Sequence, residues 1–404
     1  MTTTTRSSLA KFLVLAFSFF ILCAESWSQT EKVLYSFTGP DGSMPWGGVI
    51  ADSQGNIYGA TTVGGALGCC GTVFELSPSS NGTWTEKVIY DISLGEGIDG
   101  YLPYGDLVFD SKGNLYGSTL SGGTYFAGVV FQLSPAAGGT WTEKVLYNFT
   151  GGADGGSLYA CGLTVDAAGN IFGNSDGGGA YGYGAIFEII PGPNGTFTEK
   201  VIHSFKGGND GMDPYSSPLA IDAKGRLYGA TPSGGAHDSG VVYELTPQSN
   251  GTWSEKIIYA FPNAGLGDPF GGLAMDRAGN LYSAYAFGIF ALVPQKDGTW
   301  TEKTLYNFSG SPDGAYPEGV IFDNAGNLYG TTSTGGAHRG TVFELSPSSN
   351  GSWSERVLHR FQPDGVDGIF PQFGPVAIDA SGNVYGSTPQ GGSAGQGVVF
   401  EITK

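Results

Sequence analysis

Hydrophobic and polar residues alternate in short runs along most of the chain, which is the pattern of half-buried β-strands. One stretch alternates over residues 105–110, resumes over 115–119 and again over 129–133. A longer alternating run, from Trp141 to Phe149, follows a turn at Gly138-Gly139. No apolar stripe with the helical period continues for ten residues after the N-terminal segment. The chain is therefore predicted to be all-β, in units of four strands that we call A, B, C and D.

This four-strand unit recurs with a spacing of about 54 residues. The tetrapeptide Gly-Asn-(Leu/Ile/Val)-(Tyr/Phe) has its asparagine at Asn56, Asn114, Asn170, Asn280, Asn327 and Asn383, with Arg226 in that place in one more copy. A second marker, aromatic-(Thr/Ser)-Glu-(Lys/Arg), has its glutamate at Glu86, Glu143, Glu199, Glu255, Glu302 and Glu355, and Glu31 opens a further copy. About seven all-β units of this length predict a seven-bladed β-propeller, with strand A nearest the axis.

The two ends of the repeat region complement each other. Residues 31–37 form a D strand with no A, B or C strand before it, whereas the C-terminal part supplies A, B and C strands over 376–379, 384–387 and 398–402 and no D. Pairing them completes the last blade and closes the ring, whereas a solenoid would need capping repeats. We therefore expect residues 29–404 to form a single propeller domain.

The first residues have the features of a targeting segment. An apolar run over Phe12–Ala24 follows a positively charged start, and Ser26 and Ser28 suit a cleavage site. The run is short for a membrane span, which needs about 20 residues. We expect residues 1–28 to be a cleaved signal peptide and the mature protein to be secreted or periplasmic. An uncleaved anchor and a lipoprotein modified at Cys23 are the less favoured alternatives.

Composition narrows the class of partner. The 70 glycines suit tight turns, and a content of 13% aromatic residues is enough to build a core. The net charge of −18 argues against nucleic acid and anionic membrane surfaces as partners. After cleavage the cysteines are Cys69, Cys70 and Cys161, an odd number that leaves at least one thiol unpaired. Their spacing does not indicate a zinc site.

The repeat also resembles a known family. Asp-x-x-Gly-Asn-Leu-Tyr-Gly is followed by Gly-Gly, then by Gly-x-Val-Phe-Glu-Leu-x-Pro and Gly-x-Trp-x-Glu-Lys-Val-Leu-Tyr-x-Phe. This combination resembles the GloVer (Gloeo/Verruco) tandem repeat over residues 30–403. The resemblance implies an exported bacterial β-propeller, often tethered by a C-terminal anchor that this sequence does not show. It supplies no catalytic residues.

Residues present in every unit are expected to serve the fold. Each A–B turn begins with an aspartate, at Asp52, Asp110, Asp166, Asp222, Asp276, Asp323 and Asp379. A ring of seven carboxylates could bind metal, but an aspartate in such a turn accepts hydrogen bonds from its own backbone, and we favour that role. The aromatic residues at the start of each D strand are predicted to pack between sheets.

Asp-Gly pairs recur as well, at Asp41, Asp99, Asp154, Asp210, Asp313 and Asp367. They could form calcium loops, but no complete Asp-x-Asp-x-Asp-Gly loop occurs, so turns are favoured. No cofactor is predicted, and support for calcium is weak.

Function should lie where the units differ. On the D–A loops, one position reads Trp46, Tyr104, Tyr159, Tyr215, Phe270, Glu318 and Gln372 along the chain. The B–C loops, which share that face, add Leu67, Tyr125, Tyr181, His237, His338 with Arg339, and Ala394. One sector of the face is therefore aromatic and the other polar, although the aromatic residues could instead pack between blades.

Three functions stay open at this stage. A non-catalytic module that binds an extracellular glycan or polymer would use the aromatic residues as stacking platforms. A protein-interaction scaffold would present an apolar patch on this face. An enzyme, a hydrolase or lyase with a site at the channel mouth, would need paired acids, a nucleophile with its base, or a metal cluster, and only Glu318, His237 and His338 come near this. We favour a monomeric glycan-binding protein without a membrane span after cleavage.

Overall fold

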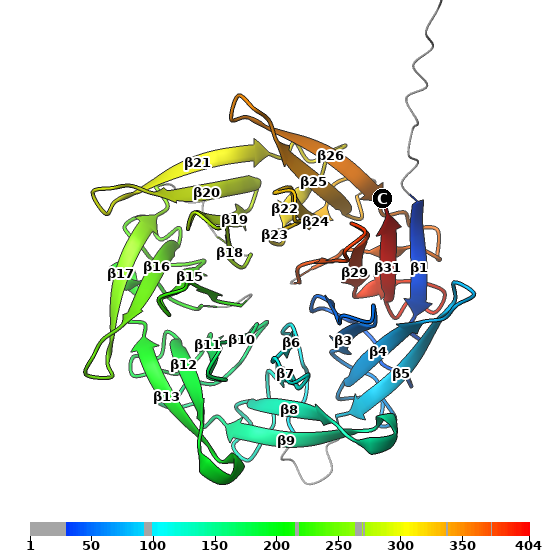
Figure 1. Ribbon diagram of the computed structural model, residues 1–404, viewed down its shortest axis with the longest axis horizontal. Helices are drawn as coiled ribbons and strands as arrows, with labels where there is room; N and C mark the ends of the chain where they lie inside the picture. Colours follow the sequence, from blue (N-terminus) through cyan, green and yellow to red (C-terminus); the bar gives the residue numbers. More distant parts are fainter. Residues whose placement is uncertain are drawn as a thin grey trace, which may run out of the picture.

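Seven antiparallel blades form a closed ring in the computed structural model, which describes residues 30–92, 99–214, 218–262, 269, 271–336, 338–372 and 374–404 (Figure 1). Strand A of each blade is nearest the axis and strand D is outermost. The predicted all-β, seven-bladed propeller is thus confirmed. The predicted signal segment lies outside the described residues. In the part of the chain described, no helix has the length and apolar character to cross a bilayer.

The blades follow one another along the chain, each in the order A to D. The first three contain β2 (Ile50–Ala51), β3 (Ile57–Thr61), β4 (Thr72–Pro78), β5 (Trp84–Asp91); β6 (Val108–Phe109), β7 (Leu115–Ser118), β8 (Val129–Pro135), β9 (Trp141–Asn148); and β10 (Thr164–Val165), β11 (Ile171–Ser175), β12 (Ala185–Pro191), β13 (Phe197–Ser204). The next two contain β14 (Ala220–Ile221), β15 (Leu227–Thr231), β16 (Val241–Pro247), β17 (Trp253–Ala260); and β18 (Ala274–Met275), β19 (Leu281–Tyr285), β20 (Gly288–Pro294), β21 (Trp300–Asn307). The A strands are thus only two residues long.

The last two blades carry small additions. Blade 6 contains β23 (Ile321–Phe322), β24 (Leu328–Thr334), β25 (Thr341–Pro347) and β26 (Trp353–Arg360), and a fifth strand, β22 (Ala315–Pro317), pairs with the far end of β24. Blade 7 contains β28 (Ala377–Ile378), β29 (Val384–Thr388), β31 (Val398–Thr403) and β1 (Thr30–Ser36), beside a two-stranded ladder of β27 (Gly368–Ile369) and β30 (Gln390–Gly391). Three short 3-10 turns are Ala137–Gly139, Pro193–Gly195 and Gly208–Asp210.

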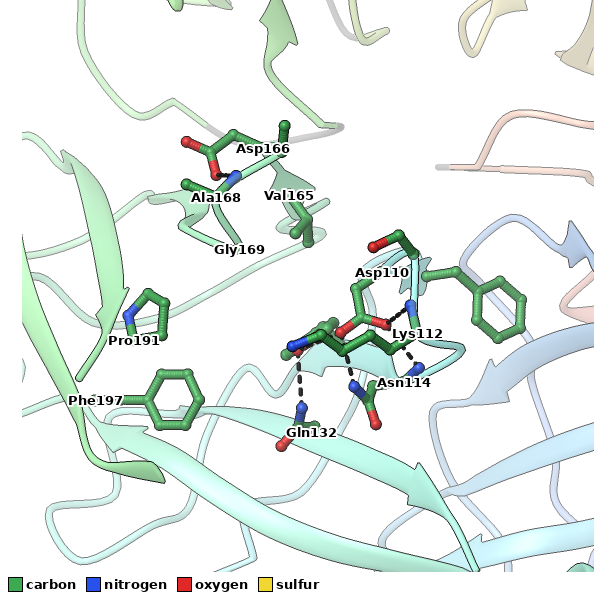
Figure 2. A pocket seen from close by; sticks show the side chains of 14 residues that line it. Asp110, Lys112, Asn114, Gln132, Val165, Asp166, Ala168, Gly169, Pro191 and Phe197 are labelled. Carbon is green, nitrogen blue, oxygen red and sulfur yellow. Dashed lines mark hydrogen bonds between the residues drawn. The ribbon is translucent and has the colours of Figure 1, made fainter. Parts of the chain in front are cut away.

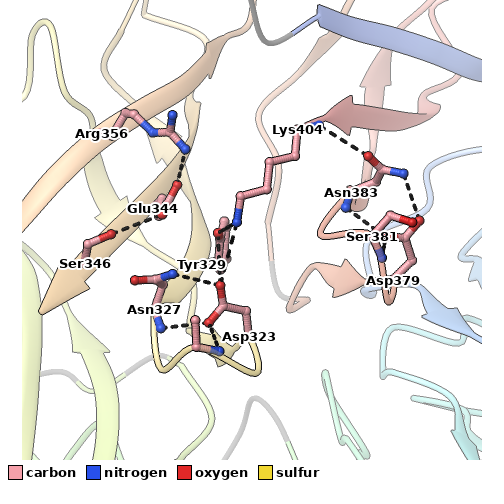
Figure 3. A network of polar contacts seen from close by, with 11 residues as sticks. Asp323, Asn327, Tyr329, Glu344, Ser346, Arg356, Asp379, Ser381, Asn383 and Lys404 are labelled. Carbon is pink, nitrogen blue, oxygen red and sulfur yellow. Dashed lines mark hydrogen bonds and ion pairs between the residues drawn. The ribbon is translucent and has the colours of Figure 1, made fainter. Parts of the chain in front are cut away.

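The N-terminal strand closes the ring as predicted. β1 pairs antiparallel with β31 from Thr30 opposite Thr403 to Ser36 opposite Val398, and the two arrows lie side by side in Figure 1. The end of the chain is tied to blade 6 as well, because the Lys404 ammonium lies 3.2 Å from the Tyr329 hydroxyl (Figure 3). Closure therefore joins both ends of the chain to neighbouring structure.

The core is divided among the blade interfaces. Seven clusters of buried hydrophobic residues each combine strands of two adjacent blades. The outer tryptophans pack edge-on against an aromatic residue of the preceding blade, as Trp141 does with Tyr58 and Trp253 with Phe172. The prediction that these rings pack between sheets is confirmed.

The A–B turns show why their aspartate is present in every blade. In blade 2, Asp110 Oδ1 accepts hydrogen bonds from the backbone N–H groups of Lys112 (2.8 Å) and Asn114 (2.9 Å), and Oδ2 accepts one from the Asn114 side chain. Tyr116 donates a further bond to Oδ2. The same backbone bonds recur in the other six turns. The structural interpretation of this aspartate is confirmed.

A second repeated group lies at the outer edge of six of the seven interfaces, and we call it the outer triad. It consists of the Tyr or His near the end of strand D, the Asp of the Asp-Gly pair that follows, and the Glu of strand D in the next blade. Tyr147 donates a 3.0 Å hydrogen bond to Asp154, and Thr150 N–H donates one of 2.8 Å to the same carboxylate. The third member, Glu199, has a buried Oε1 without a hydrogen-bond partner, and burial raises its pKa to about 7. These aspartates thus serve as turn and interface residues.

Candidate ligand-binding site

The D–A and B–C loops meet on one face of the ring. In each of the first four blades a single β-bridge links the two loops, pairing Ser43 with Val63, Tyr101 with Ser121, Gly156 with Gly177 and Met212 with Ser233. In blades 6 and 7 the corresponding contacts are β22–β24 and β27–β30. The bridges hold the variable loops against regular strands, so that their side chains have defined positions.

Three of the predicted aromatic residues form a continuous row, which we call the aromatic row. The rings of Trp46 and Tyr104 lie 6.2 Å apart, and those of Tyr104 and Tyr159 lie 5.1 Å apart, tilted by 48° and 47°. All three side chains are partly exposed and come from consecutive blades. Tyr215 and Phe270, predicted to extend the row, lie outside the described residues. The structure therefore brings together the predicted aromatic positions that it describes.

The charge of Glu318 reaches the aromatic row. Burial raises the pKa of Tyr104 and of Tyr159, and the negative charges of Asp176 and Glu318 raise that of Tyr159 further. Tyr159 lies on the loop that leads into blade 3, and Glu318 lies on the loop that leads into blade 6. The Glu318 side chain also lines a cavity of about 110 Å³ whose walls are mainly apolar, including Leu273 and Val320.

The remaining predicted polar residues are spread over the rim. His237 and His338 are exposed on B–C loops of different blades, and Gln372 is partly buried. The Arg339 guanidinium lies over the Phe370 ring at 5.0 Å. Phe370 belongs to the loop that leads into blade 7, so Arg339 contacts a neighbouring loop, whereas His237 and His338 lie on the B–C loops of blades 4 and 6.

Three residues behind the aromatic row were missed by the sequence analysis. Asp106 is only 7% exposed, accepts a 2.6 Å hydrogen bond from Gly48 N–H, and has its pKa raised to about 7 by burial. Asp176 has a raised pKa, also because it is buried, and its Oδ1 lacks a hydrogen-bond partner. Cys161 is a free, buried thiol with a pKa of about 12. The side chains of Asp106 and Asp176 are thus buried carboxyl groups close to Tyr104 and Tyr159, respectively.

A signal for two of these residues existed in the sequence. Asp106 stands where the other blades have glycine or proline, at Gly48, Gly162, Pro218, Gly272, Gly319 and Pro375. Asp176 follows a B strand where the other blades have Thr62, Leu120, Pro232, Ala286, Ser333 and Pro389. Both residues flank a strand, Asp106 before β6 and Asp176 after β11, so a comparison of the blades at these flanking positions distinguishes them.

The largest of the described pockets lies on the opposite face. It measures about 470 Å³ and is formed by the A–B turns of blades 2 and 3, where Asp110, Lys112, Asp166 and Phe197 surround it (Figure 2). Similar pockets of about 290 and 260 Å³ lie between the turns of blades 4 and 5 and of blades 6 and 7. Because these grooves recur with the repeat, we attribute them to the shape of adjacent turns and place the candidate site on the variable face.

The closed ring, its four-stranded blades and its single variable loop face define a seven-bladed β-propeller. The chain belongs to the Gloeobacter/Verrucomicrobia repeat family, whose sequence model matches residues 24–160, 138–291 and 288–404. This confirms the resemblance seen in the repeat. No curated protein sequence is significantly similar to the chain.

Solved structures share the fold at low sequence identity. Virginiamycin B lyase from Staphylococcus aureus is 14% identical with a TM-score of 0.54, and the match covers 93% of this chain and 99% of that one. The extracellular domain of a protein described as a hybrid two-component system, from B. thetaiotaomicron, is 16% identical with a TM-score of 0.56 over 93% of this chain and 41% of that one. At these identities the likeness shows the fold alone, and that fold carries both a lyase and an extracellular domain.

Proposed function

We propose that the exported protein binds a neutral polysaccharide, or a similar polyhydroxylated polymer, on the D–A and B–C loop face. The observation that carries this proposal is the aromatic row, in which three partly exposed rings from consecutive blades touch in sequence. Sugar rings have flat apolar C–H faces that stack on such platforms. A polymer offers several of these faces in succession, which suits a row better than a single deep pocket.

Polar groups beside the row would supply orientation. Glu318, whose charge acts on Tyr159, can accept hydrogen bonds from sugar hydroxyl groups, and the Gln372 amide can donate or accept them. The net charge of −18 repels anionic polymers at long range, so a neutral ligand is favoured. The expected interaction is weak at each sugar and is strengthened by the number of sugars bound.

A scaffold role is the second candidate, and a specific observation supports it. The B–C loops of blades 1 to 3 expose large hydrophobic side chains, with Tyr125 at 57%, Phe126 at 70% and Leu67 at 61% exposure. Tyr181 and Tyr183 are exposed on the third of these loops. A set of exposed hydrophobic side chains on adjacent loops is typical of a protein-binding surface. It lies outside the aromatic row, so the two functions can be separated by mutation.

The test is retention on insoluble neutral polysaccharides. We expect Tyr104→Ala/Tyr159→Ala to bind about 30-fold more weakly, because each stacked ring contributes about 1 kcal/mol. Tyr104→Phe/Tyr159→Phe keeps the rings and should bind nearly as well as the native protein. The rim variant Tyr125→Ala/Tyr181→Ala, which also loses two tyrosines, is the matched control and should be retained.

The outcomes separate the three functions. Equal retention of the folded double-alanine variant, or no retention of the native protein on any polysaccharide, would favour the scaffold. Shortening of the polymer during incubation would favour the enzyme, for which the buried acid Asp176 beside Tyr159 is the candidate group. Loss of that shortening in Asp176→Asn would then assign the acid.

A further inference from the structure

The six outer triads allow an internal comparison, because two of them differ from the rest. Four carry a tyrosine near the end of strand D, at Tyr35, Tyr90, Tyr147 and Tyr306, and two carry a histidine, at His203 and His359. The seventh interface has Tyr259 at this position but no Asp-Gly pair after it. Tyrosine hydroxyls donate hydrogen bonds to the triad aspartate in four described cases. Histidine replaces this donor with an imidazole nitrogen, which can also bind a metal.

The triad of Glu31, His359 and Asp367 gathers three such groups. His359 Nε2 lies 2.9 Å from Asp367 Oδ2, and one ligand atom from each of the three residues lies within 4.8 Å of the others. His359 belongs to β26 of blade 6, Asp367 to the loop that leads into blade 7, and Glu31 to the N-terminal strand β1. The cluster therefore lies where the first strand meets the sixth blade.

Two carboxylate oxygens in this cluster lack a hydrogen-bond partner. Asp367 is 6% exposed, and its Oδ1 has no hydrogen-bond partner, although Oδ2 contacts His359 and accepts a bond from Gln362 N–H. Glu31 Oε1 is likewise buried without a partner. An unpartnered buried carboxylate oxygen is costly. A cation held between the two carboxylates and the imidazole would satisfy both oxygens.

The donor set indicates the kind of cation. Imidazole nitrogen together with carboxylate oxygen suits zinc and other first-row transition metals, with a solvent molecule available as the fourth ligand. Calcium normally takes six to eight oxygen ligands, which three protein atoms do not supply. We propose that Glu31, His359 and Asp367 form a site for Zn²⁺ or a similar divalent transition metal, which ties the N-terminal strand to blade 6 and so locks the closed ring.

The other histidine triad provides a weaker match. In the triad of His203, Asp210 and Glu255, His203 Nε2 lies 3.5 Å from Asp210 Oδ2. The positive charge of Lys206 acts on both His203 and Glu255. At the first triad, by contrast, the additional charge that acts on Glu31 is the negative charge of Asp364. Repulsion from Lys206 disfavours a cation at the second triad, so the site at β1 should bind more tightly.

Titration of the purified, chelator-treated protein with zinc chloride tests the proposal. The native protein should bind Zn²⁺ and melt at a higher temperature with it. His359→Tyr, which restores the residue of five other interfaces and should fold, is expected to bind at least about 100-fold more weakly and to lose the zinc-dependent shift. His203→Tyr is the matched control and should keep both. Anomalous diffraction at the zinc edge should place the ion between Glu31 and Asp367.

Several results would overturn the site. These are no zinc binding by the native protein, equal binding by native protein and His359→Tyr, or an ion located elsewhere. If His359→Tyr fails to fold, Asp367→Asn takes its place, with the same expected loss. A calcium-induced rise in melting temperature as large as that with zinc would contradict the assignment to a transition metal.

Discussion

The two faces of the ring are built from the same repeat, but one face has residues that recur in every blade and the other has residues that change from blade to blade. On the face of the A–B turns, the aspartate and its backbone hydrogen bonds recur in all seven blades, and similar grooves recur between turns. On the loop face, a single position holds Trp46 in one blade, Tyr104 in the next and Glu318 in the sixth. A residue needed by every blade stabilises the fold, whereas a residue that changes from blade to blade is available for recognition.

In a repeat protein, the size of a pocket does not by itself identify the functional site. The largest of the described pockets lies among A–B turn residues, and it has smaller counterparts around the ring. The aromatic row, by contrast, is a feature that the repeat does not reproduce in blades 6 and 7. The distinction can be tested, because changes to shared features should lower stability and changes to variable ones should lower binding.

The largest effect is expected from removing a feature that the whole ring needs. Deleting residues 31–37 removes β1, which pairs with β31 along its length and contributes Leu34 and Phe37 to the buried cluster between blades 7 and 1. The exposed edge of β31 should cause aggregation. Thermal unfolding and size-exclusion chromatography would measure this. A monomeric truncation with an unchanged melting temperature would contradict the closure.

A smaller loss should follow from breaking one A–B turn. Asp110→Ala removes the acceptor of bonds from Lys112, Asn114 and Tyr116, and should lower the free energy of unfolding by about 2 kcal/mol. Denaturant unfolding would measure it. Gln372→Ala, a change on the variable face, is the comparison and should cost far less. Equal losses of unfolding free energy in the two variants would contradict the proposed difference between the faces.

The outer triads predict a pH dependence of stability. Burial, with the charge of Asp99 added, raises the pKa of Glu143 to about 7, and the glutamates of the other five triads resemble it. The folded state then holds these protons more tightly than the unfolded chain. This contribution to stability is fully present below the unfolded pKa of about 4.5 and is lost as the pH rises through 7.

The melting temperature should therefore be higher at pH 5.5 than at pH 8. Glu143→Gln, which stays neutral, should match the native protein at pH 5.5 and exceed it slightly at pH 8. Scanning calorimetry at both pH values checks this. Greater stability of the native protein at pH 8 would show that the triad glutamates do not control the dependence.

The smallest effect is expected at the disulfide between Cys69 and Cys70. It joins adjacent residues in a B–C loop, so it encloses almost no chain and restricts the unfolded state little. Cys69→Ser/Cys70→Ser should unfold within about 0.5 kcal/mol of the native protein in denaturant. A loss comparable to that of Asp110→Ala would mean that this loop of the variable face supports the ring.

Comparison between the loops of different blades predicts part of the candidate site from the sequence. Trp46, Tyr104 and Tyr159 were singled out because they share one loop position, and the structure places their rings in contact. His237 and His338 were grouped with Glu318 by the same reasoning, but each lies exposed on its own loop. Shared position in a repeat determines the face on which a residue lies. It does not determine whether side chains of different blades meet.

The blades, their number, the closing strand and the turns could all be predicted from the sequence, because they depend on short-range alternation and on hydrogen bonds within a few residues, as at Asp110 and Asn114. Which residues of different blades meet across the interfaces is seen only in the tertiary structure. Glu31 meets His359 and Asp367 near the opposite end of the chain, and the charge of Glu318 reaches Tyr159 from three blades away. Those distances follow from the packing of blades around a closed ring, a property of the whole ring that no single repeat contains.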